Sequence, residues 1–357
     1  MSNSPLPPPI PPMPPVQNAA PYPPARPKRS IWRVLGILLV IFMGLFLIGS
    51  LACNLVLFAA IATLQGGSAG EDGVTARVAQ DVVVRGGNDK IAILPAHGAV
   101  DEAMVERVHR YIAGIKADSR IRAVVLEVDS PGGTITASDE IHHMLTGLRA
   151  SNYRLYVSMK SLAASGGYYI SMPAESIYAE PTTITGSIGV IWPAFEMSGL
   201  LQKIGVTPEI ITSDEAVYKD TASPFKKFTE EDRKYIKLLV NDAHKKFAGI
   251  VDTGRRGKLT VPMDQIAIGR VWPAEEAKKL GLIDEIAYTE DVCLALAKAE
   301  GISNPTIVRM KDRTGLFDLL GVAANANRGK ITLDPKMIYE MQTPRMEYRY
   351  IDPTILR

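Results

Sequence analysis

Residues 161–170 read SLAASGGYYI, and they follow an expected strand at residues 154–159, RLYVSM. The stretch opens a short apolar segment that we expect to be helical. A serine in a strand-to-helix turn of small residues can present its hydroxyl, and the backbone N–H groups that follow are free to hold an oxyanion. Close packing alone also produces tight turns of small residues. The stretch by itself therefore leaves both interpretations open.

Strand and helix patterns alternate along the chain before this stretch. In chain order, they occupy residues 91–94, 102–115, 123–128, 136–148 and 154–159. Single helices between strands predict an α/β fold with a parallel sheet and right-handed crossovers. Ligands bind such sheets at the C-terminal ends of the strands. Both Ser165 and the turn Ser130-Pro131-Gly132-Gly133 fall at such ends, which favours a functional site.

The chain continues with similar elements after the stretch. We expect strands at residues 182–191, 209–211 and 306–310, and helices at 229–250, 274–280 and 289–300. Residues 311–357 form a C-terminal extension. Its prolines and the run Tyr348-Arg349-Tyr350 suggest a partly extended segment that docks on another surface.

The N-terminal region predicts a membrane anchor. Residues 1–30 are proline-rich and expected to be a disordered cytoplasmic tail, and residues 31–64 form an apolar run longer than the roughly 20 residues that span a bilayer. Basic residues precede the run and acidic residues follow it, so we expect a single-pass protein of the plasma or inner membrane with its N-terminus in the cytoplasm. A cleaved signal peptide fits less well, because the run is too long. Residues 65–89 are an expected linker with a candidate short strand at residues 82–84.

Composition excludes several classes of function. Lys and Arg number 40 and Asp and Glu 38, so the net charge of +2 indicates no nucleic-acid partner. Cys53 and Cys293 form no framework, and no His, Cys, Asp or Glu group has the spacing of metal ligands. We expect neither a metal nor a cofactor.

Two residue types could serve a serine as general base. Four of the five histidines, His109, His142, His143 and His244, lie in helical patterns; only His97, at a strand end, remains a candidate. Lysine is the other known partner of a nucleophilic serine. Lys219 lies in a loop rather than on a charged helix face, although a plain surface lysine is the alternative.

Five motifs together closely resemble the short form of the signal peptide peptidase A (protease IV) family. They are DSPGG at 129–133, SLAASGG at 161–167, TITGSIGV at 183–190, YKDTASPF at 218–225 and residues 269–284. The resemblance covers roughly residues 85–310. It implies a Clp-protease/crotonase-like α/β fold for a serine peptidase domain at residues 90–310, preceded by the transmembrane helix.

The resemblance also implies the roles of individual residues. Ser165 would be the nucleophile, Lys219 the general base and Ser187 the residue that orients the lysine. The oxyanion donors would be the backbone N–H groups of Gly166 and of Gly132 or Gly133. A homo-oligomeric ring would bring serine and lysine together from neighbouring subunits.

The implied substrates are cleaved signal peptides and other unfolded, apolar peptides outside the cytoplasm. A crotonase-type enzyme acting on acyl-coenzyme A and an inactive membrane scaffold with the same fold are the alternatives. The presence of both Ser165 and Lys219 favours the peptidase.

Overall fold

The computed structural model describes residues 31–65, 78–313 and 346–350 of the chain. The chain divides into two units, Met1–Ser68 and Ala69–Arg357. The described part of the first unit is the helix α1 (Ile31–Gln65), in which 22 residues, Leu35–Val56, have a mean hydropathy of 2.7. This confirms one N-terminal apolar helix, long enough to cross a membrane or to serve as a signal sequence. The expected tail at residues 1–30 lies outside the described residues.

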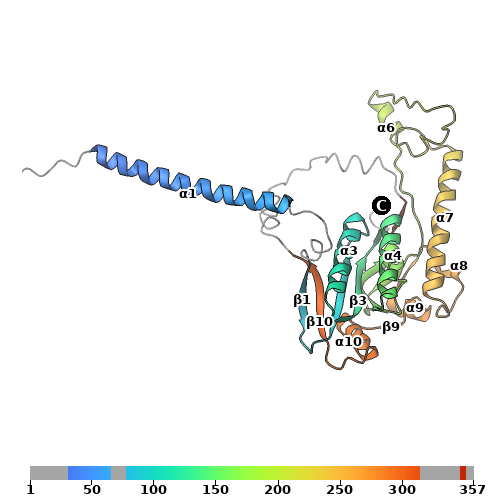
Figure 1. Ribbon diagram of the computed structural model, residues 1–357. Coiled ribbons are helices and arrows are strands. Elements are labelled where there is room, and N and C mark those ends of the chain that lie inside the picture. Colours follow the sequence, from blue (N-terminus) through green and yellow to red (C-terminus); the bar gives the residue numbers. More distant parts are fainter. Residues whose placement is uncertain (1–30, 66–77, 314–345, 351–357) are drawn as a thin grey trace, which may run out of the picture. The chain divides into compact units, whose positions relative to one another are not determined.

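The second unit is built on a sheet with the strand order β1-β10-β2-β3-β5-β6-β9 (Figure 1). In this order all neighbours from β10 to β9 are parallel, and β1 pairs antiparallel with β10. The expected α/β architecture with a parallel sheet is thus confirmed. The strands are β1 (Val78–Val84), β2 (Lys90–His97), β3 (Ile121–Ser130), β5 (Arg154–Ala164), β6 (Ser176–Ala179), β9 (Glu285–Ile286) and β10 (Thr306–Asp312).

The strand β1 changes one expected boundary. It begins before the short strand expected at residues 82–84 of the linker, and it pairs with β10 from Val78 to Val84. Its residues alternate poorly between apolar and polar, and three of its seven residues are exposed, as is typical of an edge strand.

Helices cover both faces of the sheet. Side chains of β3 alternate, so that Val124, Leu126 and Val128 face a core shared with α3 (Glu102–Ala117) and α4 (Ile135–Ala150). Ala123 and Val125 face the opposite core, with α10 (Thr289–Ala299). The expected helices at 102–115, 136–148 and 289–300 are confirmed within two residues at each end.

The remaining helices lie farther along the chain. They are α5 (Gly166–Tyr169), α6 (Ser198–Lys203), α7 (Glu230–Gly254), α8 (Met263–Ile266) and α9 (Ala274–Lys279). The expected helix at 229–250 corresponds to α7. Its start is set by a capping box, in which Thr229 and Asp232 each bond the other's backbone N–H.

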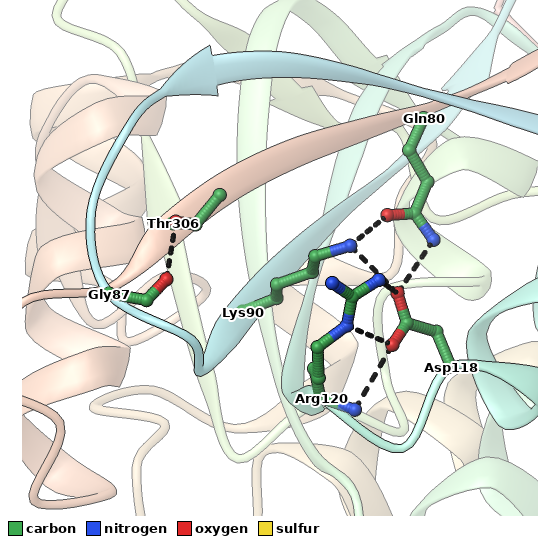
Figure 2. A network of polar contacts seen from close by, with 6 residues as sticks. All are labelled: Gln80, Gly87, Lys90, Asp118, Arg120 and Thr306. Carbon is green, nitrogen blue, oxygen red and sulfur yellow. Dashed lines mark hydrogen bonds and ion pairs between the residues drawn. The ribbon is translucent and has the colours of Figure 1, made fainter.

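A network of polar contacts joins the N-terminal end of β2 to β1 and to the residues just before β3 (Figure 2). The amine of Lys90, at the start of β2, donates to Asp118 and Gln80 at 2.7 Å each, and Arg120 donates to both oxygens of Asp118. Nearby, Thr306 donates to the carbonyl of Gly87 at 2.8 Å. The hydrogen bond from Arg120, aided by Lys90, holds the pKa of the Asp118 carboxyl well below its usual range.

Short strands complete the region around Ser165. β7 (Ile184–Gly186) pairs with the end of β5 and with β8 (Val271–Pro273), so the expected strand at 182–191 is shorter than predicted. β4 (Gly132–Thr134) pairs with β11 (Glu347–Arg349) in a separate two-stranded sheet. The strand expected at 209–211 is wrong, because these residues form an exposed loop in which Ile211 is 86% exposed.

Candidate active site

Ser165 lies in the turn between β5 and α5, where its backbone is strained. Its φ of 55° and ψ of −116° place it in a region that residues with a side chain rarely adopt. The Ser165 N–H donates to the carbonyl of Gly186 at 2.8 Å, and the Ser165 carbonyl accepts from Tyr169 at 2.9 Å. These two bonds hold a conformation that costs on the order of 1–3 kcal/mol.

The hydroxyl of Ser165 is buried and has no partner. The residue is 1% exposed, and its Oγ makes no hydrogen bond to any part of the chain that the structure describes. A buried polar group without a partner costs about 1–3 kcal/mol. Strain and an unsatisfied hydroxyl at one residue are typical of a functional site, where the missing partner is a substrate or another chain.

Glycines bring a second backbone segment against this turn. A Cβ built on Gly166 would lie 3.1 Å from both Gly132 Cα and Gly133 N, and one built on Gly167 would lie 2.8 Å from the Ser130 carbonyl oxygen. Side chains at these positions would therefore push the two segments apart. The turn at residues 130–133 and the Ser165 turn, which both follow strand ends, thus lie in contact.

The glycine N–H groups differ in their availability. The N–H of Gly132 donates to Ser130 Oγ at 3.1 Å, so it is already occupied. No described acceptor is recorded for the N–H of Gly166, at the first position of α5. Gly133 lies opposite Tyr348 in the pairing of β4 with β11. The bonds of Tyr350 to Pro131 and of Ile135 to Met346, on either side, make Gly133 and Tyr348 a hydrogen-bonded pair, so the Gly133 N–H is engaged as well. Of the three glycines, Gly166 thus has the N–H without a partner among the described residues.

Ser187 follows β7 directly, and the pairing of β7 with β5 brings its backbone next to that of Ser165. The pairing of Ala164 with Gly186 sets these two serines on adjacent strand ends. Ser187 is 6% exposed, has a φ of 51°, and donates to the Gly269 carbonyl at 3.4 Å, a long contact. It therefore has hydrogen-bonding capacity left for another group.

Lys219 does not reach Ser165 within the chain. It lies exposed in the segment between α6 and α7, and its N–H donates to the carbonyl of Ala216 at 2.9 Å. The neighbouring Asp220 bonds Lys226 at 2.8 Å, so its negative charge is compensated by that lysine.

The histidines have partners other than Ser165. Nε2 of His97 pairs with Glu127 at 3.0 Å, and Nε2 of His244 bonds the Ala267 carbonyl at 2.8 Å. Burial raises the pKa of Glu127, but the hydrogen bond from His97 and the charge of Arg309 hold it below its usual value. His97 thus contacts Glu127, and no described histidine forms a hydrogen bond with Ser165 Oγ, which disfavours histidine as the general base.

Three aromatic residues near the site, Tyr169, Tyr348 and Phe247, had no role in the site assigned from the sequence. Tyr169 donates from its hydroxyl to Asp139 at 2.7 Å, and its ring stacks on that of Tyr348 with centroids 5.1 Å apart. Phe247 of α7 packs on both rings, at 5.2 and 4.6 Å. The only sequence signal was the aromatic run at residues 348–350, because Phe247 lies in an ordinary helix pattern.

Comparison with known proteins gives the family. Residues 148–303 match the model of Peptidase family S49. The chain is 35% identical over 246 residues to a signal peptide peptidase SppA of Enterococcus faecium, covering 66% of this chain and 70% of the relative. It is 33% identical to Protease 4 of Salmonella typhi, covering 58% of this chain but 34% of that protein. The chloroplastic serine protease SPPA of Arabidopsis thaliana is 30% identical over 66% of this chain and 36% of its own length.

Solved structures with some likeness include a ClpP1 variant from Listeria monocytogenes, at a TM-score of 0.38, 15% identity, and coverage of 56% of this chain and 94% of that one. Another is the membrane-bound stomatin-specific protease 1510-N, at a TM-score of 0.36 and 18% identity. That match covers 58% of this chain and 84% of the protease. At these TM-scores the likeness carries no argument about chemistry. The relatives found by sequence are more informative. Together with the family match, they show that the chain belongs to peptidase family S49, as a serine peptidase of the SppA type.

Proposed function

We propose that this chain is a membrane-anchored serine endopeptidase with a serine–lysine dyad, in which Ser165 is the nucleophile and Lys219 the general base. The observation that carries the proposal is the buried, unpartnered hydroxyl of Ser165 in its strained turn. Ser187 would orient the lysine. The backbone N–H groups of Gly166 and of Gly132 or Gly133 would supply the oxyanion donors. Residues 90–310, extended by β1, would form the peptidase domain.

The chemistry balances with these groups alone. Neutral Lys219 takes the proton of Ser165 as Oγ attacks a peptide carbonyl, and each N–H donor stabilises the resulting anion by about 2.7–4 kcal/mol. The protonated amine returns its proton to the leaving nitrogen, and the C–N bond breaks. Water, activated by the same lysine, then hydrolyses the acyl-enzyme and frees Ser165.

A second copy of the chain is the proposed source of Lys219. The segment between β7 and α7 exposes large apolar side chains; Phe195, Ile204, Ile211 and Val217 are 63–86% exposed. Such a surface is costly in water and fits burial against another subunit. Burial in a homo-oligomeric ring would also favour the neutral amine of Lys219.

We place the substrates outside the cytoplasm. The apolar span Leu35–Val56 of α1 is preceded by Arg26, Lys28, Arg29 and Arg33. This order supports an anchor with its N-terminus in the cytoplasm and its apolar residues in membrane lipid. The relative named as a signal peptide peptidase SppA supports cleaved signal peptides and other unfolded apolar peptides as substrates. A crotonase-type activity is disfavoured by the family, and an inactive scaffold is an outcome of the assay below.

The test is hydrolysis of a fluorogenic apolar peptide by the full chain in detergent. Ser165→Ala and Lys219→Ala should each abolish activity. Ser161→Ala and Lys227→Ala, exposed residues of the same two segments, should leave it within about twofold, as surface substitutions usually do. Activity that survives either dyad substitution would contradict the mechanism, and an inactive wild type would favour the scaffold.

A mixing experiment tests the origin of the lysine. Equal amounts of Ser165→Ala and Lys219→Ala chains, co-expressed, should regain about a quarter of the wild-type activity if each site joins two subunits in a symmetric ring. A dyad within one chain predicts no recovery.

A further inference from the structure

The strand β5 carries a bulge shortly before Ser165. Met159 of β5 lies opposite Val128 of β3. The next pair along the two strands is Ala163 with Ser130, so β5 advances four residues where β3 advances two. The bulge therefore holds two extra residues of β5, just before the turn that carries Ser165.

The bulge decides which serine of the sequence SLAAS, residues 161–165, reaches the candidate active site. In a continuous register, Ser161 would lie opposite Ser130. Ser165 would then lie about 7 Å farther along, because each residue of a strand adds about 3.3 Å. With the bulge, Ser161 is exposed and Ser165 is buried in its turn. Bulges beside active sites commonly re-aim a side chain in this way.

Side chains from neighbouring strands bind the backbone of the bulge. Oδ1 of Asp129, in β3, accepts from the N–H of Leu162 at 3.1 Å. The hydroxyl of Thr183, just before β7, donates to the carbonyls of Met159, at 3.1 Å, and of Lys160. These two side chains thus supply partners to backbone groups that the bulge takes out of the regular ladder.

The environment of these side chains fits a positioning role. Thr183 is 1% exposed, so loss of its hydroxyl would remove a partner from backbone groups in a buried place. Asp129 is partly exposed. The C-terminal end of the bulge is held in the same manner, because the hydroxyl of Thr185 donates to the Ala163 carbonyl at 2.7 Å.

We infer that Asp129 and Thr183 are positioning residues for catalysis, because their side chains hold the bulge that delivers the Ser165 hydroxyl to the site. The inference rests on the proposed function, since the position of Ser165 matters for turnover only if this residue is the nucleophile. Among the described residues, neither side chain bonds Ser165 Oγ. Both act through the backbone of residues 159–162.

Paired substitutions in the full chain in detergent test the inference. Thr183→Val removes the hydroxyl and keeps the branched shape, and Asp129→Ala removes the acceptor. Each should lower kcat for a fluorogenic apolar peptide about 100-fold, as a displacement of about 1 Å can do. KM should stay within about threefold, because the bulge bonds are not made to substrate. The rate at which a fluorophosphonate probe labels Ser165, identified by mass spectrometry, should fall with kcat.

Conservative variants at the same positions are the controls. Thr183→Ser keeps the hydroxyl donor and Asp129→Asn keeps a side-chain oxygen acceptor, so both should retain kcat within about threefold of wild type. Equal losses in Thr183→Val and Thr183→Ser would overturn the inference, because packing rather than the hydrogen bond would then be responsible. Wild-type kcat in both Thr183→Val and Asp129→Ala would overturn it as well.

A thermal melt and the wild-type labelling complete the test. Asp129 decides the outcome if only Thr183→Val fails to fold. If both variants lose their cooperative melt, the two side chains stabilise the fold rather than the position of the nucleophile, and the inference fails. A wild type whose Ser165 is not labelled would contradict the proposed function. A labelled wild type, with Thr183→Val and Asp129→Ala labelled equally fast, would contradict this inference alone.

Discussion

Gly166→Ala tests the packing of the Ser165 turn against the Gly132–Gly133 segment. The added Cβ would lie 2.6 Å from Ser138 Oγ and 3.1 Å from Gly132 Cα and Gly133 N. The Ser138 hydroxyl could rotate only by giving up its 2.8 Å bond to the Thr134 carbonyl. The two backbone atoms could yield only if the segments separated. Overpacking of this kind costs about 1–3 kcal/mol.

The substitution should harm activity more than stability. About 1–3 kcal/mol would lower the melting temperature by roughly 2–12 °C for a unit of this size. Separation of Gly133 from Gly166 would disturb both proposed oxyanion donors, and loss of one such donor lowers kcat about 100- to 1000-fold. The assay compares kcat for a fluorogenic peptide with a calorimetric melt of the same preparation.

Gly147→Ala is the matched control. Gly147 lies in α4, and a Cβ there would meet nothing within 4 Å. Because alanine favours helices over glycine by about 1 kcal/mol, this variant should be slightly more stable and fully active. Activity of Gly166→Ala within about threefold of wild type would refute the argument that these glycines set the donor geometry. An equal loss of activity in Gly147→Ala would do the same.

Three further predictions concern charge. Asp284→Ala should destabilise the protein by about 3–5 kcal/mol in urea unfolding, because it leaves the Arg255 guanidinium, which is 1% exposed, without its carboxylate. Lys258→Ala is the control, since Lys258 pairs with the same carboxylate. A loss of stability in Asp284→Ala no larger than that in Lys258→Ala would contradict the prediction. Asp118 has a folded-state pKa below its unfolded value of about 3.9, so its stabilisation is complete above about pH 5 and is lost as the pH falls. Asp118→Asn should flatten the decline in stability between about pH 5 and 3, and an unchanged slope would count against the network. Peptide hydrolysis should rise with pH as Lys219 loses its proton, and an acidic optimum would argue against a lysine base.

Much of the fold follows from local patterns. The apolar run that forms α1, the periodicity of α3 and α4, and the buried strands β3 and β5 depend on side chains close together in the chain. The position of Ser165 at the end of β5 follows from the same patterns, because a strand, a run of small residues and a helix succeed one another there. The strand expected at residues 209–211 failed because a strand also needs a neighbour to pair with, and none lies beside it in the part of the chain that the structure describes.

The sequence by itself therefore determined the βα order, the apolar helix and the serine at a strand end, because these depend on neighbouring residues. Only the tertiary structure decided which groups meet across long separations. It paired His97 with Glu127, occupied the N–H of Gly132 with Ser130 Oγ, and kept Lys219 on the surface of its own chain. It also set Tyr348 between Tyr169 and Phe247, beside a glycine more than two hundred residues earlier. Such contacts depend on how whole elements pack, which no local pattern of side chains records.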